Sequence, residues 1–289
     1  MSGVGSCPSR SILNQFKSEA NARVFVLRVL RLLALISVSL MAQQSVANSF
    51  LFPATACLNA PYTGAQTPGQ RGLANLMRDL RRLLVDFPSL LDTLEAQSPQ
   101  LCYSDTLLTE KAYFDVDENR IVLSTDLSHG LALVVLVHEV QHVDQLARGI
   151  CPTQDLAMHE YAHGVLAMEA DANVISLLVA WKSKAEGDAS LWHALEDWQM
   201  TADIAARFDA VMRENHDFVA AATAAFEQWY ASDRRRELYY IASCSAYLDH
   251  QDRTHALPRY LSLSDDYFSR LCILPDGQPY ACLNVIAAD

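Results

Sequence analysis

The sequence predicts an α+β fold that is predominantly helical and contains one small β element. Two observations support this prediction. Apolar residues recur at three- and four-residue steps over most of the chain, as in helices, and only residues 112–124 hold short β-prone runs around a turn. A hydrophobic content of 51% against 19% charged residues is that of a chain able to bury a sizeable core.

Residues 1–47 are predicted to form a signal peptide that is cleaved after Ala47. They combine a basic lead, an uncharged apolar run at residues 32–42, and small residues, Ser45 and Ala47, just before the cleavage point. A membrane anchor is disfavoured because a spanning helix needs roughly 20 apolar residues, whereas Arg31 limits this run. We therefore expect a periplasmic or secreted protein with no stable membrane span after cleavage.

The mature chain is expected to be acidic and to contain disulfides. The leader holds five basic residues and one acidic residue, so its removal leaves 242 residues and changes the formal charge from −12 to −16. This charge argues against nucleic acid as a partner, because phosphates are neutralised by clustered Lys and Arg. Six cysteines remain, which predicts up to three disulfides without fixing their pairing. They are Cys57, Cys102, Cys151, Cys244, Cys272 and Cys282.

The first part of the mature chain is predicted to contain a helix and a hairpin. Residues 53–71 are rich in Pro, Gly, Thr and Ala and predict an irregular loop. Apolar residues then follow a helical period from Gly72 to Leu94, with an interruption near Pro88. Two β-prone runs within residues 112–124 flank a polar turn, which predicts a small hairpin or an edge strand.

A long apolar helix is predicted from Leu131 to Ala147. Residues 124–128 offer N-cap side chains before it, and Gly149 and Pro152 end it. A second helical stretch covers some part of residues 153–184.

The remainder is expected to be helical and then irregular. Helical periods continue over residues 191–213, 218–230 and 235–248. We therefore expect one domain over residues 48–250 and a C-terminal tail over residues 251–289 that is tethered by disulfides.

The candidate catalytic motif, His138-Glu139-Val140-Gln141-His142, lies in the long apolar helix. Side chains four residues apart on a helix project about 40° apart, so both imidazoles can reach one metal ion. Zinc held by two His and one carboxylate keeps a position for water and lowers the pKa of that water to about 7. Glu139 lies about 100° around from His138, where it can act as general base toward the water. Such a site hydrolyses peptide or amide bonds.

A second copy of the pattern, His159-Glu160-Tyr161-Ala162-His163, shows that the motif alone is a modest signal. We favour the first copy, because burying two polar imidazoles in so apolar a helix is costly unless a binding partner satisfies them. The β element before it can also offer an edge to a peptide substrate. The second copy stands in a polar neighbourhood, where solvent can satisfy both histidines.

Glu169 is the predicted third ligand, because an unpaired carboxylate in its apolar helical run would be costly. Asp171 is the nearest substitute but projects about 200° away, so one of the two is expected to ligate and the other to orient a neighbouring group. Glu169 reaches the site only if residues 150–160 are largely loop. A tight connection would instead bring Glu160 or His163 opposite the histidines.

Three segments resemble the zincin metallopeptidases of the gluzincin type, and in particular a group of uncharacterised bacterial proteins classed as metallopeptidases. They are residues 112–123, the helix with His138-Glu139-x-x-His142 and Gln145, and Glu169-Ala170-Asp171-Ala172. The likeness covers about residues 100–250, including a downstream helix with Ala225–Tyr230 and Tyr239-Tyr240.

The resemblance implies a zincin-like domain with His138, His142 and Glu169 as zinc ligands and Glu139 as the general base. Asn173 stands where gluzincins have an acidic residue, which leaves open what orients the zinc histidines.

Two further groups of residues have candidate roles. Tyr239 and Tyr240 are candidates for the donor that stabilises an oxyanion, although aromatic residues at this spacing more often belong to the core. The run Arg234-Arg235-Arg236 is interpreted as a solvated helix face rather than a site for a substrate carboxylate.

The sequence thus predicts an exported zinc-dependent peptidase that acts on peptide or protein substrates. The alternative, from a different class, is a catalytically inactive exported helical protein that binds metal or serves as a scaffold. The substrate and the oligomeric state are not determined by these patterns.

Overall fold

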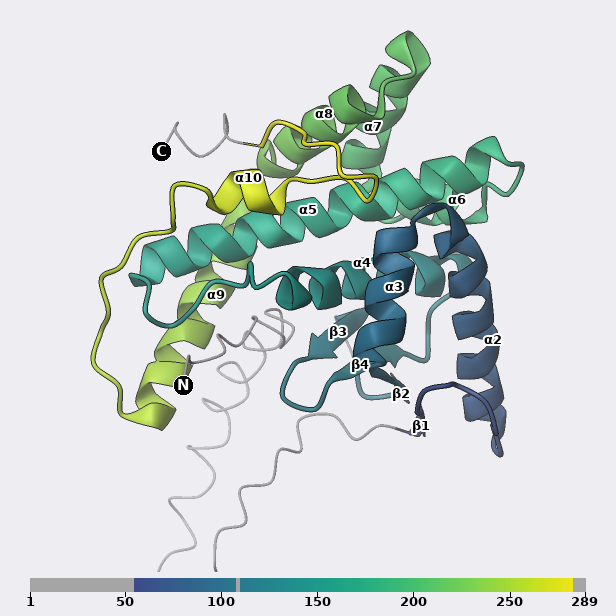
Figure 1. The fold of residues 1–289 in the computed structure, drawn as a ribbon, viewed down its shortest axis with the longest axis horizontal. Coiled ribbons are helices and arrows are strands. Elements are labelled where there is room, and N and C mark those ends of the chain that lie inside the picture. The colour runs from purple at the N-terminus through teal and green to yellow at the C-terminus, as the bar shows by residue number, and fades with distance from the viewer. Residues whose placement is uncertain (1–54, 108–109, 283–289) are drawn as a thin grey trace, which may run out of the picture.

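The computed structural model describes residues 55–107 and 110–282. The predicted signal peptide, residues 1–47, lies outside these described residues. Helices dominate the fold, and a small sheet packs beside them (Figure 1). The predicted α+β class with a helical majority is therefore confirmed. The division into residues 48–250 and 251–289 stays a prediction, and a helix runs across its boundary, as described below.

The sheet has four short strands in the order β1-β2-β4-β3. Their bounds are Ala56–Leu58 for β1, Gln100–Ser104 for β2, Ala112–Asp115 for β3 and Arg120–Ser124 for β4. Strands β2 and β4 are parallel, and the other two pairs are antiparallel. The hairpin of β3 and β4 is the predicted one, and β3 forms an edge of the sheet.

Helices α2 (Pro68–Leu83) and α3 (Pro88–Gln97) precede β2 and are separated by a 3-10 turn, η2 (Leu84–Asp86). The predicted break near Pro88 is thus confirmed. The prediction of an irregular loop over residues 53–71 is wrong in part, because β1 and the first turn of α2 lie there. Thr67 caps α2 reciprocally with Gln70, a signal that marks the helix start before the apolar period begins.

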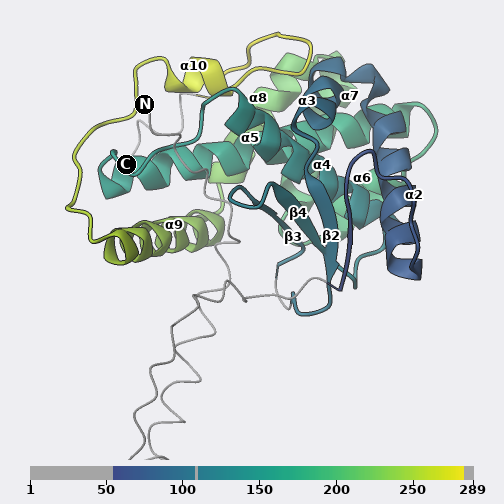
Figure 2. The same cartoon turned by 60° about the horizontal axis from the view of Figure 1, so that its bottom comes forward.

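Helices α4 (His129–Ala147) and α5 (Met158–Ala185) form the centre of the molecule. Ser128 caps α4 by accepting a hydrogen bond from the backbone of Leu131. Helix α4 packs against the sheet on one side and against α3, α5 and α6 on others, and Figure 2 shows it above β3 and β4. This enclosure explains why its sequence is apolar around most of its circumference.

Helix α5 has the length and hydropathy of a membrane span among the described helices, yet 89% of its most apolar stretch is buried in the protein. It packs against α4, α6, α8 and α9. The burial is that of a core helix, so its apolar sequence is explained by packing.

Five further helices complete the part of the fold that the structure describes. They are α6 (Ser190–Asp197), α7 (Ala202–Asn215), α8 (Phe218–Tyr230), α9 (Asp233–Thr254) and α10 (Tyr267–Leu271). The single helical stretch expected over residues 191–213 is two helices, because the backbone at Trp198 is extended and ends α6. At this break the Thr201 hydroxyl donates a hydrogen bond to the Leu195 carbonyl. Helix α8 has the predicted bounds, and α9 continues past residue 250.

Two disulfides join described cysteines, Cys57–Cys102 and Cys272–Cys282. The first links β1 to β2, and the second closes a loop within the C-terminal segment. Cys244 is a free thiol, so three disulfides among the six expected cysteines do not form. Cys151 is also disulfide-bonded.

Candidate metal centre

Three side chains with metal-binding atoms meet where α4 packs against α5. His138 and His142 come from α4, Glu169 comes from α5, and their ligand atoms lie within 4.8 Å of one another. The Nε2 atoms of the histidines are 3.1 Å apart, and the Glu169 carboxylate oxygens lie 3.4 and 3.5 Å from them. Among the described residues, no other three His, Cys, Asp or Glu side chains converge in this way.

The connection between α4 and α5 permits this meeting. Helix α4 ends at Ala147 and α5 begins at Met158, so residues 148–157 form a loop. Glu169 then lies about three turns into α5, beside the histidines of α4. The condition stated for Glu169 from the sequence, a long loop instead of a tight turn, is therefore met.

The charge states of Glu169 and His142 suit metal binding, whereas the raised pKa of His138 favours its protonated form in the metal-free protein. Burial alone would raise the pKa of Glu169, but His142, His138 and the Tyr239 hydroxyl hold that pKa below its usual value. Burial lowers the pKa of His142. For His138, burial also acts to lower the pKa, but its hydrogen bond with Glu169 raises it overall. An ionised carboxylate and a neutral imidazole are the states in which these side chains bind a metal.

Glu139 stands beside the cluster on α4 and is only 6% exposed. Its carboxylate accepts a hydrogen bond from the backbone N–H of Phe114 in β3. Burial raises the pKa of Glu139 to about 7; the charge of His138 opposes this rise and that of Glu169 adds to it. A carboxyl with this pKa can take up and release a proton near neutral pH.

Asp171 is turned away from the cluster and acts behind it. Its fully buried carboxylate accepts hydrogen bonds from Gln145 Nε2 at 2.8 Å and from the Tyr280 hydroxyl at 2.6 Å. Gln145 Oε1 in turn lies 2.8 Å from His142 Nδ1. Asn173, which stands where an acidic residue is expected, donates instead to the Glu169 carbonyl. The group that orients a candidate ligand is therefore Gln145, supported by Asp171.

The second copy of the motif lies elsewhere on α5. His159 Nε2 pairs with Glu160 at 3.1 Å, and Glu160 also accepts a hydrogen bond from the Leu263 backbone. The ring of His163 lies 6.2 Å from that of Tyr240. Neither Glu160 nor His163, the two reserve ligands, is part of the metal-binding cluster.

The two candidate oxyanion donors on α9 point to different places. The Tyr239 hydroxyl is hydrogen-bonded to Glu169 and so lies at the cluster. The Tyr240 hydroxyl pairs with the Cys244 thiol instead. Only Tyr239 is therefore placed to act on a substrate at the cluster.

The interpretation of Arg234-Arg235-Arg236 as a solvated face is wrong for Arg235. This residue is 4% exposed and donates to the carbonyls of Trp229, Gln228 and Met200 and to Asp203. Arg235 points toward α8 and α7, whereas Arg234 is exposed and Arg236 is half-buried. The Arg235 guanidinium is therefore already used within the protein and is not free to bind a substrate carboxylate.

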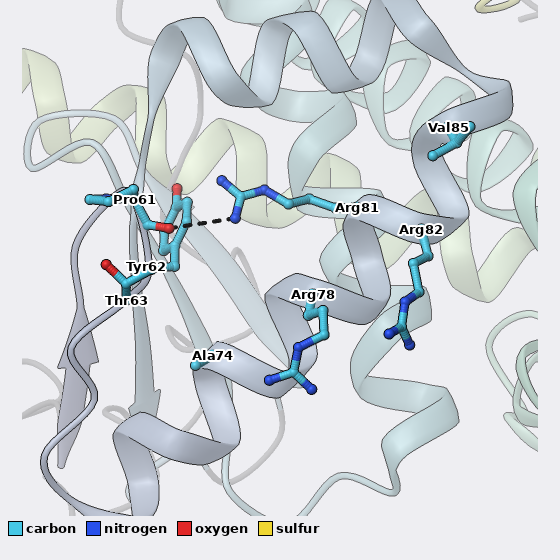
Figure 3. Close-up of a pocket in the computed structure, with 8 residues that line it drawn as sticks. All are labelled: Pro61, Tyr62, Thr63, Ala74, Arg78, Arg81, Arg82 and Val85. Atoms are coloured by element: carbon cyan, nitrogen blue, oxygen red, sulfur yellow. Dashed lines mark hydrogen bonds between the residues drawn. The ribbon is translucent and has the colours of Figure 1, made fainter.

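A pocket of about 530 Å³ opens between α2 and residues 61–63, and none of the cluster residues lines it (Figure 3). Three arginines of α2 border it: Arg78, Arg81 and Arg82. Arg81 is already paired with Glu95 at 2.6 Å and lies over the Tyr62 ring. The pocket is therefore not the site of the chemistry that the cluster suggests.

Tyr280 is the residue of this region that sequence reasoning missed. It lies in the C-terminal segment, 109 residues from its partner Asp171. The available signal was its place between Cys272 and Cys282, but their pairing was not known from the sequence.

Comparison with known proteins agrees with this chemistry. Residues 43–282 match the model of a family described as "Putative metallopeptidase family (DUF6782)". No curated protein and no solved structure matches the chain. The matched range includes the cluster, Glu139 and the loop that carries Tyr280.

Proposed function

The chain belongs to this putative metallopeptidase family, and on that premise we propose that it is an exported, zinc-dependent peptidase of the zincin type. The observation that carries the proposal is the convergence of His138, His142 and Glu169 beside a buried Glu139. Two imidazoles and one carboxylate are a donor set typical of catalytic zinc. When bound, zinc polarises a carbonyl and lowers the pKa of a water molecule.

Glu139 is the general base in this proposal. Its pKa of about 7 suits a group that accepts a proton from the attacking water and then passes it to the leaving amine. Tyr239 is positioned to donate its hydroxyl to the oxyanion that develops on the substrate carbonyl. His142 is oriented for ligation by Gln145.

The edge strand β3 offers a place for the substrate backbone. Ser124 donates its backbone N–H to the Lys111 carbonyl, so in this antiparallel register Tyr113 faces β4 with its hydrogen-bonding groups. The backbone N–H and C=O groups of Ala112 and Phe114 then point away from the sheet, and the Phe114 N–H donates a hydrogen bond to the Glu139 carboxylate. A peptide added as a strand along β3 would bring a scissile bond close to Glu139.

Export is part of the same proposal. Disulfides persist in oxidising compartments, and the Cys57–Cys102 and Cys272–Cys282 bonds support a location outside the cytoplasm. N-terminal sequencing of the protein recovered from the periplasm or the medium should begin at Asn48. A protein retained with residues 1–47 attached would contradict cleavage after Ala47.

The metal is tested on the purified mature protein. We expect elemental analysis to find about one zinc per chain, and we expect His142→Ala to lose it. His163→Ala, from the second copy of the motif, is the matched control and should retain zinc. If no metal were bound after zinc is supplied, the proposal would be contradicted.

The base is tested separately from the metal. Glu139→Gln should retain zinc and lose peptide hydrolysis, since the amide cannot accept the proton of water. Glu160→Gln changes the same residue type in the second copy and should leave activity unchanged. A zinc-loaded wild type that cleaves no peptide or cell-wall amide would favour the inactive scaffold instead.

A further inference from the structure

The orientation of Gln145, behind His142, is determined by its hydrogen bonds. Its Nε2 atom donates to Asp171 Oδ2 at 2.8 Å and to the Met168 carbonyl at 3.1 Å. Both amide hydrogens are thereby used, and neither an ionised Asp171 carboxylate, which three donors surround, nor a backbone carbonyl can donate. The Oε1 atom must therefore be the one that faces His142 Nδ1, at 2.8 Å.

This orientation selects one tautomer of His142. Because Oε1 only accepts, His142 Nδ1 must carry the hydrogen, and Nε2 keeps its lone pair. Nε2 is the atom that lies 3.1 Å from His138 Nε2 and 3.5 Å from Glu169. The hydrogen bond thus presents a metal-binding nitrogen to the cluster before any metal arrives.

Asp171 supplies the acceptor that fixes the Gln145 amide. Its carboxylate is fully buried and is held by three donors: Gln145, Gln141 and the Tyr280 hydroxyl. The Tyr280 bond, at 2.6 Å, is the shortest and is the one made to the Oδ1 atom. Without it, Oδ1 would lose this donor, and the carboxylate would be free to rotate away from Gln145.

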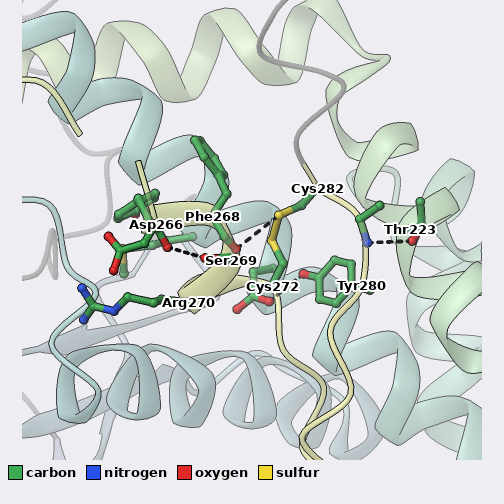
Figure 4. The surroundings of a disulfide bond; sticks show 12 residues. Thr223, Asp266, Phe268, Ser269, Arg270, Cys272, Tyr280 and Cys282 are labelled. Carbon is green, nitrogen blue, oxygen red and sulfur yellow. Dashed lines mark hydrogen bonds between the residues drawn. A yellow bond between two sulfur atoms is a disulfide. The ribbon is translucent and has the colours of Figure 1, made fainter. Parts of the chain in front are cut away.

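Tyr280 reaches this position from a loop that a disulfide closes (Figure 4). Cys272 and Cys282 are bonded ten residues apart, and Tyr280 N–H donates to the Cys272 carbonyl. Ala281 N–H donates to Thr223 on α8, which ties the loop to the body of the protein. The Tyr280 side chain is 5% exposed and packs beside Phe226.

We propose that Tyr280 is a positioning residue for metal binding, and that the Cys272–Cys282 loop holds His142 in its ligating form through Asp171 and Gln145. The proposal rests on the proposed function, because it assumes that His142 binds a metal. It adds a role for the C-terminal segment, which contributes none of the three ligands.

The test compares two tyrosines of the same segment. Tyr280→Phe removes the hydroxyl and keeps the ring beside Phe226. Tyr267→Phe is the matched control, since Tyr267 is also 5% exposed and donates its hydroxyl to the Gly164 carbonyl, outside the His142 hydrogen-bond chain. We expect Tyr280→Phe to weaken zinc binding by about 10-fold or more, as loss of a supporting group around a metal typically does.

Zinc affinity is measured by competition with a chromophoric chelator, and thermal unfolding of both metal-free variants reports their stability. Similar melting temperatures with a zinc affinity reduced only in Tyr280→Phe support the proposal. Equal zinc affinities in the two variants would overturn it. A wild type that binds no zinc would instead overturn the proposed function.

A second measurement needs neither a variant nor a metal. Nitrogen-15 NMR of the metal-free wild type distinguishes the two neutral tautomers of a histidine. We expect His142 to be protonated at Nδ1, whereas protonation at Nε2 would overturn the proposal. This measurement tests the predicted tautomer even if Tyr280→Phe does not fold or the wild type binds no zinc.

Discussion

At the scale of single residues, the buried carboxyl group of Glu139 makes the stability of the protein depend on pH. Its pKa of about 7 in the metal-free protein lies above the 4.5 of a free Glu, because burial disfavours the charged form. The folded state then binds more protons than the unfolded state between these two values. The free energy of unfolding should therefore fall as pH rises from about 4.5 through about 7.

Replacing Glu139 by Gln removes this pH-dependent cost. We expect the metal-free Glu139→Gln protein to be more stable than wild type at pH 8 by roughly 2–3 kcal/mol, with no such advantage at pH 4.5. Urea unfolding at several pH values measures the difference. Glu160→Gln is the control, and an advantage for Glu139→Gln that does not vary with pH would contradict this account.

Tyr239 and Tyr240 allow a matched test of oxyanion stabilisation. Tyr239→Phe removes the hydroxyl at the cluster and should lower kcat by roughly 10²–10³-fold, with a smaller effect on KM. Tyr240→Phe removes a hydroxyl that pairs with Cys244 and should leave both constants unchanged. Bound zinc is measured in each variant, and equal kcat values at equal zinc content would exclude this role for Tyr239.

At the scale of the elements, Arg235 fixes the start of α9 and so the place of Tyr239 one turn later. Its buried guanidinium ties α9 to the end of α8 and to Asp203 on α7. Arg235→Ala should lower the free energy of unfolding by about 1–3 kcal/mol, because it leaves the carbonyls of Trp229, Gln228 and Met200 without their donor. Arg234→Ala, at an exposed neighbour, should change it by less than about 0.5 kcal/mol. Equal urea midpoints for the two variants would contradict the buried role.

Elements with a strong local period could be predicted from the sequence, and those that depend on distant partners could not. Helix α8 has the predicted bounds because its apolar period and its Asp217 cap agree. Strand β1, with three residues, carries too short a pattern and exists by pairing with β2. The break before α7 coincides with an extended Trp198 and a side-chain hydrogen bond of Thr201, neither of which periodicity reveals.

The same distinction applies to the candidate site. His138 and His142 come together through helical spacing alone, which is a local property. Placing Glu169 at the site required knowing that the connection between α4 and α5 is a long loop, which the sequence supported only in part. The contact of Tyr280 with Asp171 spans 109 residues and leaves no periodic trace in the sequence.

At the scale of the whole molecule, the two disulfides that join described cysteines are expected to serve different purposes. Cys57–Cys102 joins two strands 45 residues apart, and Cys272–Cys282 closes a separation of ten. Loop entropy alone assigns them roughly 4 and roughly 3 kcal/mol of stability. Of these two, only Cys272–Cys282 closes a loop whose residue Tyr280 is linked by hydrogen bonds to His142, a proposed metal ligand. Stability and metal binding should therefore be separable.

Serine replacement of each pair tests this separation. Removing Cys57 and Cys102 should cost more free energy of unfolding and leave the zinc affinity of the folded protein unchanged. Removing Cys272 and Cys282 should cost less stability but weaken zinc binding by about 10-fold or more, because the loop that positions Tyr280 is no longer closed. Urea unfolding and chelator competition on both double variants provide the two measurements. If zinc affinity simply followed stability across them, the C-terminal loop would have no specific connection to the metal centre.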